Sequence, residues 1–309
     1  MQNNANPYAV VIGGANIDIC GAPTNTLIHN DSNIGDVTTS PGGVARNIAE
    51  NLSLMDIDCR LIAAVGADHY GDLLIEQGES AGIDMTHILR VGNMKTSIYL
   101  SVLDNEGDML VAINDMGIVD HLDKNYLKTM DQAISQAKAI VVDTNLSEDT
   151  LAYLMETYAD QDIIIDTVSS TKAMRAKPHL NSIHTLKANR QEAEALCGTH
   201  DNLSDMATWF HEKGVKRIFI TLGSEGVFHS DGVEQGQETM SSSDPVINAS
   251  GAGDAFVAGI TYAWFQGWKL TKSTQFAISA ATVALAHKST INPAMSVAVI
   301  NKIREQEYE

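Results

Sequence analysis

The chain carries little positive charge. Of its 309 residues, 20 are Lys or Arg and 39 are Asp or Glu, which gives a formal net charge of −19. A surface this acidic repels the phosphates of nucleic acids and of anionic membranes, so we expect neither as a partner. An anionic substrate must therefore be held by donors placed locally, such as a helix N-terminus and one or two lysines.

Cysteines and long hydrophobic runs are also scarce. Cys20, Cys59 and Cys197 lie far apart and form no CxxC motif, and three cysteines cannot all pair, so we expect reduced thiols. The longest apolar stretch, around 276–286, is broken by Ser and Thr and is too short to span a bilayer. Residues 1–7 lack the basic and apolar regions of a signal peptide. Together these features predict a soluble protein of the cytoplasm.

Several common cofactor motifs are missing. The sequence contains no GxxxxGKS/T motif and no GxGxxG that opens a helix, which disfavours both a P-loop enzyme and an NAD-linked oxidoreductase. Its ten histidines form no HxxxH or similar cluster, so transition-metal catalysis is not expected.

Strand and helix patterns alternate along the whole chain without a linker, so we expect one domain over residues 1–309. Short apolar, β-branched runs predict strands at 9–12, 61–65, 139–142, 163–165 and 218–220. Helical patterns predict helices at 43–54, 70–80, 148–158, 190–197 and 203–213. Apolar strands separated by helices are typical of an α/β fold with a mostly parallel sheet covered on both faces.

Two stretches depart from this alternation. Residues 17–39 are polar, rich in turns and strand-like, while 96–103 and 109–113 predict a hairpin around the turn at 104–107. We place this unit at about 14–40 and 95–117. It could be a lid over a pocket, an edge used for dimerisation, or a simple edge hairpin.

The stretch 246–259 gives the strongest chemical signal. A β-prone pair leads to Gly251-Ala252-Gly253, then Asp254 and an apolar helical run. Small residues at a helix N-terminus let an anion approach bare backbone N–H groups. An acid beside such an anion hole can take a proton from a hydroxyl while a phosphoryl group is transferred. The alternative is a glycine turn followed by an ordinary first-turn acid.

Further polar candidates follow a predicted strand or open a predicted helix. Gly42 and Gly43 allow a ligand close to the backbone at a helix start, and Asn47 lies one turn on. A tight turn explains these glycines equally well. Asn16 and Asp18 follow the first strand, where open α/β sheets bind ligands, and a carboxylate at Asp18 suits a vicinal diol. Capping of the loop is the alternative there.

A second helix start carries Asn189 and Glu192, just after Lys187. Their spacing forms a capping box, which is a sufficient structural reason for both residues. The same side chains could instead arrange a hydrated Mg²⁺ beside nucleotide phosphates. The following segment, 221–226, predicts a strand, a glycine turn and a second strand, which could cover those phosphates.

In this order the motifs resemble those of the ribokinase (PfkB) family of carbohydrate and nucleoside kinases. The segments that carry the resemblance are 13–18, 41–47, 189–192, 221–223 and 251–254. The resemblance implies a three-layer α/β/α sandwich with a small β-sheet lid, ATP and Mg²⁺ as cofactors, and transfer to a primary sugar hydroxyl. It also implies a homodimer formed through the lid.

The resemblance also suggests roles for single residues. Asp254 is expected to be the catalytic base, and Gly251, Ala252 and Gly253 the anion hole. The substrate is expected at Asn16, Asp18, Gly42, Gly43, Asn47, Tyr99, Asn114 and Asp115. The nucleotide is expected at Lys187, Asn189, Thr221, Gly223, Gly226 and Asn292, with hydrated Mg²⁺ near Asn189 and Glu192.

Within the family, segments 103–116, 183–187 and 246–248 are most similar to bacterial pseudouridine kinases, which implies phosphorylation of the 5′-hydroxyl of pseudouridine. Uracil in a C-nucleoside offers two ring N–H donors, for which Asn114 or Asp115 could supply acceptors. A kinase for ribose, a fructose-type sugar or adenosine stays an alternative, as does a catalytically silent ligand-binding relative.

One segment departs from the family pattern. The family usually has Asp-Thr where this chain has Asn248-Ala249. In the family those positions often help to hold a monovalent cation, so the sequence leaves activation by K⁺ open.

Overall fold

A central eight-stranded sheet forms the body of the protein. The computed structural model describes residues 6–198, 202–239, 247–248 and 250–308. In spatial order the strands are β14 (Gln235–Glu238), β13 (Val227–Ser230), β12 (Arg217–Thr221), β11 (Thr185–Asn189), β10 (Ile163–Asp166), β9 (Ala139–Asp143), β1 (Ala9–Ile12) and β4 (Cys59–Ile62). The strands from β12 to β4 are parallel, and β13 and β14 are antiparallel. The prediction of a mostly parallel sheet is confirmed.

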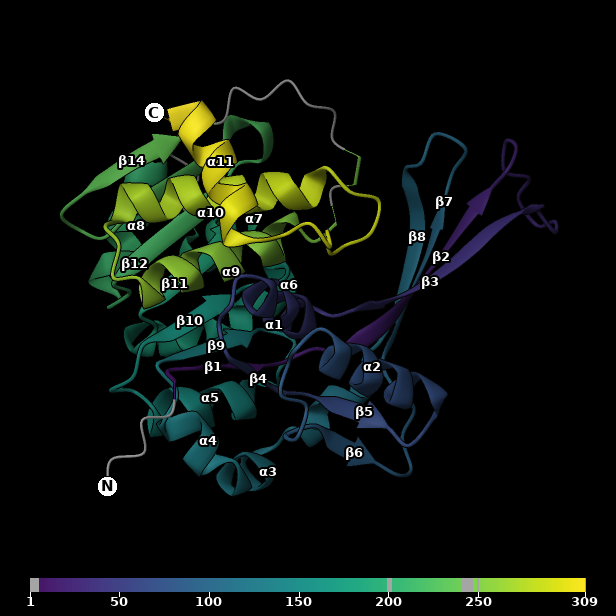
Figure 1. Ribbon diagram of the computed structural model, residues 1–309, viewed down its shortest axis with the longest axis horizontal. Helices are drawn as coiled ribbons and strands as arrows, with labels where there is room; N and C mark the ends of the chain where they lie inside the picture. The colour runs from purple at the N-terminus through teal and green to yellow at the C-terminus, as the bar shows by residue number, and fades with distance from the viewer. Residues whose placement is uncertain (1–5, 199–201, 240–246, 249, 309) are drawn as a thin grey trace.

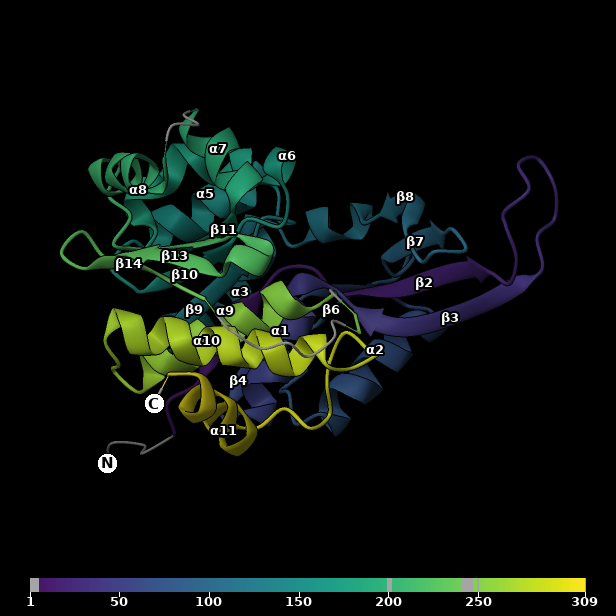
Figure 2. The ribbon, with the colours of Figure 1, turned by 90° about the horizontal axis from the view of Figure 1, so that it is seen from above.

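Helices cover both faces of this sheet (Figure 2). One face packs against α1 (Val44–Leu54), α2 (His69–Ser80), α9 (Ala252–Phe265), α10 (Leu270–Leu285) and α11 (Val297–Tyr308). The other face packs against η1 (Gly117–His121), α3 (Lys124–Thr129), α4 (Asp131–Ser135), α5 (Glu148–Thr157), α6 (Ser170–Ala173), η2 (Met174–Ser182), α7 (Arg190–Cys197) and α8 (Leu203–Glu212). Among the residues described, no helix is long and apolar enough to cross a membrane.

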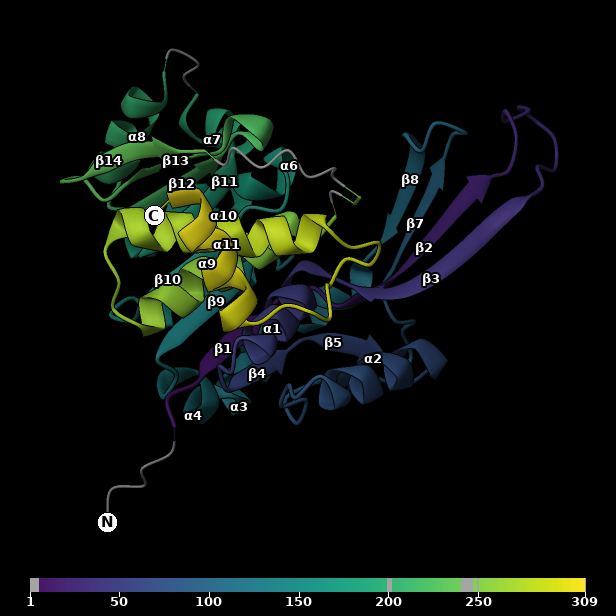
Figure 3. The ribbon, with the colours of Figure 1, turned by 45° about the horizontal axis from the view of Figure 1, so that its top comes forward.

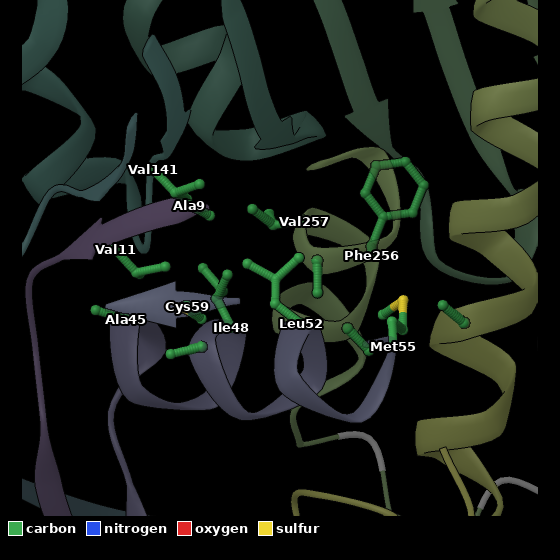
Figure 4. Close-up of a cluster of buried hydrophobic side chains, with 14 of the residues drawn as sticks. Ala9, Val11, Ala45, Ile48, Leu52, Met55, Cys59, Val141, Phe256 and Val257 are labelled. Carbon is green, nitrogen blue, oxygen red and sulfur yellow. The ribbon is translucent and has the colours of Figure 1, made fainter. Parts of the chain in front are cut away.

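The alternation of side chains along each strand produces two hydrophobic cores. On β1, Ala9 and Val11 enter one core, and the residues between and after them enter the other. Figure 4 shows the first core, in which β1 and α1 meet Phe256 and Val257 of α9. Because Phe256 and Val257 are fully or almost fully buried, they hold the first turn of α9, and with it Asp254, in a fixed place.

A second sheet projects from the body (Figures 1 and 3). Its strands, in spatial order, are β3 (Gly35–Gly42), β2 (Asn16–Pro23), β7 (Ile98–Leu103) and β8 (Met109–Asp115). Register places Asp18, Tyr99 and Asn114 side by side on one face. The opposite face is mostly apolar and includes Val37 and Ile113. These strands lie in the segments that we predicted as a lid, although β3 runs past residue 40.

The prediction of a single strand over 61–65 is wrong. Strand β4 ends at Ile62, and β5 (Ala64–Gly66) leaves the central sheet to pair in parallel with β6 (Leu89–Val91). Strand β1 ends at Ile12, directly opposite Ile62, so the residues after Ile62 have no neighbouring strand in the central sheet. Their backbone groups then bond to β6 instead, which an apolar run in the sequence does not reveal.

Candidate active site

Helix α9 presents Asp254 at its first turn. The helix begins at Ala252 after Gly251, whose φ of 82° lies in the left-handed region. A Cβ at Gly251 would collide with the carbonyl oxygen of Thr290, so only glycine fits this turn. The Asp254 side chain is nearly buried and lines a cavity between the body and the second sheet.

Four charged or polar neighbours set the acidity of Asp254. Burial raises the pKa of this carboxyl to about 7, and the charges of Asp166 and Asp143 add to the effect. A hydrogen bond of 2.8 Å from Asn47 Nδ2 to Asp254 Oδ2 and the charge of Lys187 act in the opposite direction. A carboxylate with this pKa can accept a proton near neutral pH.

Lys187 lies beside the N-terminus of α9. Its Nζ is 3.0 Å from Asp166 Oδ2, and a Cβ on Gly253 would be 3.0 Å from the same nitrogen. Burial alone would lower the pKa of Lys187, but the carboxylates of Asp166 and Glu192 raise it above its ordinary value. The ammonium therefore stays protonated next to the amides that begin the helix.

Asp18 and Gly43 form the floor of the cavity, and Gly42 lies behind Asp18. Asn16 Nδ2 donates to Asp18 Oδ1 at 2.6 Å, and burial raises the pKa of Asp18. A Cβ on Gly42 would collide with the Asp18 carboxylate, so Gly42 supports the site without lining it. Gly43 has a φ of 101°, and a Cβ there would lie 2.5 Å from the carbonyl oxygen of Gly14.

Asp143, which the sequence analysis missed, joins these parts. It ends β9, and its carboxylate accepts from the backbone N–H groups of Gly14 (2.9 Å), Ala45 (3.0 Å) and Asn145 (2.8 Å). The loop after β1 and the start of α1 are thereby held together where the chain order of the sheet reverses. An acid directly after the buried run 139–142 was the available signal.

The cavity has a volume of about 230 Å³. The predicted residues that line it are Asn16, Asp18, Gly43, Asn47, Tyr99, Asn114, Gly251 and Asp254. Residues that the sequence analysis did not single out as candidates also line it, namely Val44, Met116, Asn145, Val168, Lys172, Ser250 and Thr290. A second hollow of about 500 Å³ beside His211 and Ser230 contains none of the predicted site residues.

The two substrate candidates on β8, Asn114 and Asp115, lie on opposite faces of the second sheet. Asn114 is opposite Tyr99 and lines the cavity, whereas Asp115 is opposite Ile98 and is exposed on the other face of the sheet. Neighbouring residues of a strand point to opposite faces, so only one of this pair can face a ligand.

The residues predicted to hold the nucleotide lie outside this cavity. Asn189 and Glu192 form the capping box, with Glu192 N donating to Asn189 Oδ1 at 2.9 Å. The Glu192 carboxylate also accepts from Asn189 Nδ2 and N and from Thr167 Oγ1, so both of its oxygens are already engaged. Such a group reaches a metal ion most readily through water.

The remaining nucleotide candidates lie at the end of β12, in the turn that follows it, and in the segment after α10. Thr221 ends β12, and Gly223 and Gly226 flank the short turn to β13. Asn292 is buried, with Nδ2 donating to the carbonyl oxygen of Val283 at 2.7 Å.

Asn248 stabilises the loop that precedes α9. Its Nδ2 donates to the carbonyl oxygen of Lys288 at 2.8 Å, and its Oδ1 accepts from Ser250 N at 2.9 Å. Ala249, the other departure from the family pattern, lies outside the described residues.

Comparisons with known proteins agree with this geometry. The chain is 40% identical over 302 residues to "Pseudouridine kinase" of Escherichia coli, with 96% of each chain covered. The crystal structure of a putative sugar kinase from Clostridium perfringens superposes with a TM-score of 0.87 at 30% identity, covering 98% of this chain and 97% of that one. A putative ribokinase II of Escherichia coli in complex with ATP and Mg²⁺ shares the fold, with a TM-score of 0.83, 16% identity, and 97% and 100% coverage.

The model of the pfkB family carbohydrate kinases matches residues 6–297. The resemblance drawn from the motifs is thus confirmed, and so is the ribokinase-like fold. This chain belongs to the pfkB family of carbohydrate kinases.

Proposed function

We propose that this protein transfers the γ-phosphoryl group of ATP to the 5′-hydroxyl of pseudouridine, giving pseudouridine 5′-phosphate. The observation that carries the proposal is Asp254, a carboxylate with a pKa of about 7 that lines a cavity beside the start of α9. The relative that bears the name of this activity, and that aligns with nearly the whole chain, supports the choice of nucleoside.

The ribose is bound at the floor of the cavity. The Asp18 carboxylate can accept hydrogen bonds from both hydroxyls of a vicinal diol, and Asn16 orients it. Gly43 lets the sugar approach the backbone at the start of α1. The Asn47 side-chain amide lies between the sugar and Asp254: it can bind a sugar hydroxyl while its Nδ2 donates to the Asp254 carboxylate. This arrangement directs the 5′-hydroxyl to Asp254.

Asp254 then accepts the proton of the 5′-hydroxyl as the oxygen attacks the γ-phosphorus. Negative charge that develops on the phosphoryl group is stabilised by the amides of Ala252 and Gly253 and by the Lys187 ammonium. Bound Mg-ATP supplies the phosphoryl group and the metal charge that neutralises it. The second sheet, with Tyr99 and Asn114, covers the cavity and excludes water.

The nucleotide is assigned to the side of the sheet beyond Lys187. Thr221, Gly223 and Gly226 would face the phosphates of ATP. Asn292 would lie in the segment beside its adenine ring. Glu192 and Asn189 would contact Mg²⁺ through water, because both oxygens of Glu192 already accept hydrogen bonds within the protein. The ATP and Mg²⁺ complex of a protein with this fold supports the pairing of cofactors.

Two further properties follow from this proposal. Because the reaction consumes ATP, we assign the protein to the cytoplasm.

Because the Asn248 side chain already forms hydrogen bonds within its loop, K⁺ would have to be held by backbone carbonyls. Equal turnover in K⁺ and in tetramethylammonium buffers would exclude a role for the ion.

The second sheet is proposed to form a homodimer. Its face opposite the cavity carries Val37, Val111 and Ile113, with exposures of 73%, 54% and 61%. A matching face of a second copy would remove these side chains from water. Light scattering should report a dimer, and Val111→Lys with Ile113→Lys should give a monomer. The control Val233→Lys, at a position 98% exposed on the body, should leave the dimer intact.

The activity is tested by ADP release from Mg-ATP with pseudouridine, uridine, cytidine, adenosine, ribose and fructose. Strong turnover with pseudouridine supports the proposal if the product keeps a periodate-sensitive 2′,3′-diol, since a 5′-phosphate leaves that diol free. Preference for ribose or adenosine would retain Asp254 as the base and reject the substrate. No turnover with any of the six would reject the kinase function for these substrates.

A further inference from the structure

One wall of the cavity is built from a turn that the sequence analysis did not single out. Val168 lines the cavity with a φ of 58°, in the left-handed region that β-branched residues rarely adopt. Its backbone N–H donates to Asp166 Oδ1 at 2.8 Å, which ties the turn to the partner of Lys187. Strain of this kind persists where the surrounding structure enforces it, and it is most common at ligand sites.

Lys172 extends from α6 into the same cavity. Its Nζ donates to Asn145 Oδ1 at 2.6 Å, and Arg175 anchors that loop by donating to the carbonyl oxygens of residues 144–146. An ammonium has three donors. Within the described ranges Asn145 is the one side chain that accepts a hydrogen bond from Lys172, and the charges of Asp143 and Arg175 act on the ammonium without forming an ion pair or a hydrogen bond with it. Two donors are therefore available to a molecule in the cavity.

The position of Lys172 relative to the ribose site identifies what it can contact. The Asp18, Gly43 and Asn47 side of the cavity leads to Asp254 and is assigned to the sugar. We define the second side of the cavity by Met116, Asn145, Val168 and Lys172, which line it. Asn145 Nδ2 and Met116 Cε lie near each other, 2.8 and 3.0 Å from where a Cβ on Gly14 would be. The group attached to C1′ of the ribose would occupy this second side, between the projecting sheet and the turn at Val168.

We propose that Lys172 determines specificity for the base by donating a hydrogen bond to a carbonyl oxygen of the pyrimidine ring, while Val168 packs against the ring. This inference rests on the proposed function. Uracil presents two carbonyl oxygens, and Lys172 offers only donors, so the two are complementary. A ring without an acceptor leaves the half-buried ammonium without that partner and is rejected for this reason. Asn145 is a positioning residue that fixes the direction of the Lys172 side chain.

The test compares two substrates in two proteins. Pseudouridine and its phenyl C-riboside analogue share the ribose and a six-membered ring, but the phenyl ring has no carbonyl oxygen. We measure kcat/KM for both, with saturating Mg-ATP, in the wild type and in Lys172→Met. The matched control is Lys177→Met, which removes an ammonium from the same segment outside the cavity. Thermal melting checks that both variants fold.

Lys172→Met should lower kcat/KM for pseudouridine by about 10- to 100-fold and change that for the phenyl riboside by less than about threefold. Lys177→Met should change neither. An equal loss for both substrates would overturn the inference, because Lys172 would then act on the sugar or on phosphoryl transfer. An unchanged kcat/KM for pseudouridine would also overturn it. A wild type inactive on pseudouridine would instead reject the proposed function itself.

Discussion

Replacing Asp254 with asparagine removes a proton acceptor and also a charge that the folded protein has to bury. Asparagine has the same shape, and its Oδ1 can still accept the hydrogen bond that Asn47 donates to Asp254. The helix start at Gly251 is not touched. We therefore expect Asp254→Asn to fold normally, to lose activity and to gain stability at alkaline pH.

The size of the stability gain follows from the pKa. Folding raises the pKa of Asp254 from 3.8 to about 7, so the native state binds the proton more tightly than the unfolded chain does. The free energy that the folded protein loses by burying an ionised Asp254 is absent below pH 3.8, grows as the pH rises to 7, and stays constant above pH 7. At about 1.4 kcal/mol per pKa unit it approaches ~4 kcal/mol.

Asp254→Asn should therefore raise the free energy of unfolding by roughly 2–4 kcal/mol at pH 8, which is a rise in Tm of about 4–8 °C. The gain should shrink by about 2–3 kcal/mol at pH 5, where the native wild type is largely protonated. At both pH values the kcat of Asp254→Asn should be lower than that of the wild type by ~10²–10⁴, because the variant lacks the catalytic base. In the wild type, kcat/KM should decline below pH 7.

Melting curves at pH 5 and pH 8 and the ADP-release assay measure both effects. Near-full turnover of Asp254→Asn would refute the assignment of Asp254 as the base. A change in stability that is the same at both pH values would refute the argument that burial raises its pKa. The two failures are independent, because one concerns the reaction and the other the folded protein without ligands.

Three other substitutions test the surroundings of this carboxylate. Asn47→Ala removes the hydrogen bond that lowers the pKa of Asp254, so the acid limb of kcat/KM should move to higher pH. Asp166→Asn removes a like charge, so the same limb should move to lower pH. Gly251→Ala should lower stability by more than about 1 kcal/mol, measured by denaturant unfolding, and also lower kcat, since its Cβ would collide with the carbonyl of Thr290.

Most of the central sheet was predictable because its signals are local. The buried strands β1 and β9 are made mostly of Val and Ile, and the helix at 190–197 has a capping box at its start. The division of the run 61–65 into two strands could not be predicted, because it depends on where the neighbouring strand β1 ends.

The candidate site was predictable where one motif holds several of its residues. Gly251 and Asp254 are adjacent at one helix start, and Asn16 and Asp18 follow one strand. Asn145 and Lys172 could not be recognised in this way. They reach the cavity because β9 ends beside β1 and β10 ends beside β9, and no local pattern in the sequence reveals that strand order.

Two of the chain's many acidic residues, at the ends of β9 and β10, affect the chemistry of the site. Asp143 and Asp166 end neighbouring strands, and both charges raise the pKa of Asp254 beyond what burial does alone. Lys187 opposes them, and its own charge is held by Asp166. With the lysine alone, Asp254 would be a weaker base; with the aspartates alone, it would be protonated at neutral pH. The balance of these charges, which no single motif contains, is what gives the carboxylate a pKa near the pH at which it has to act.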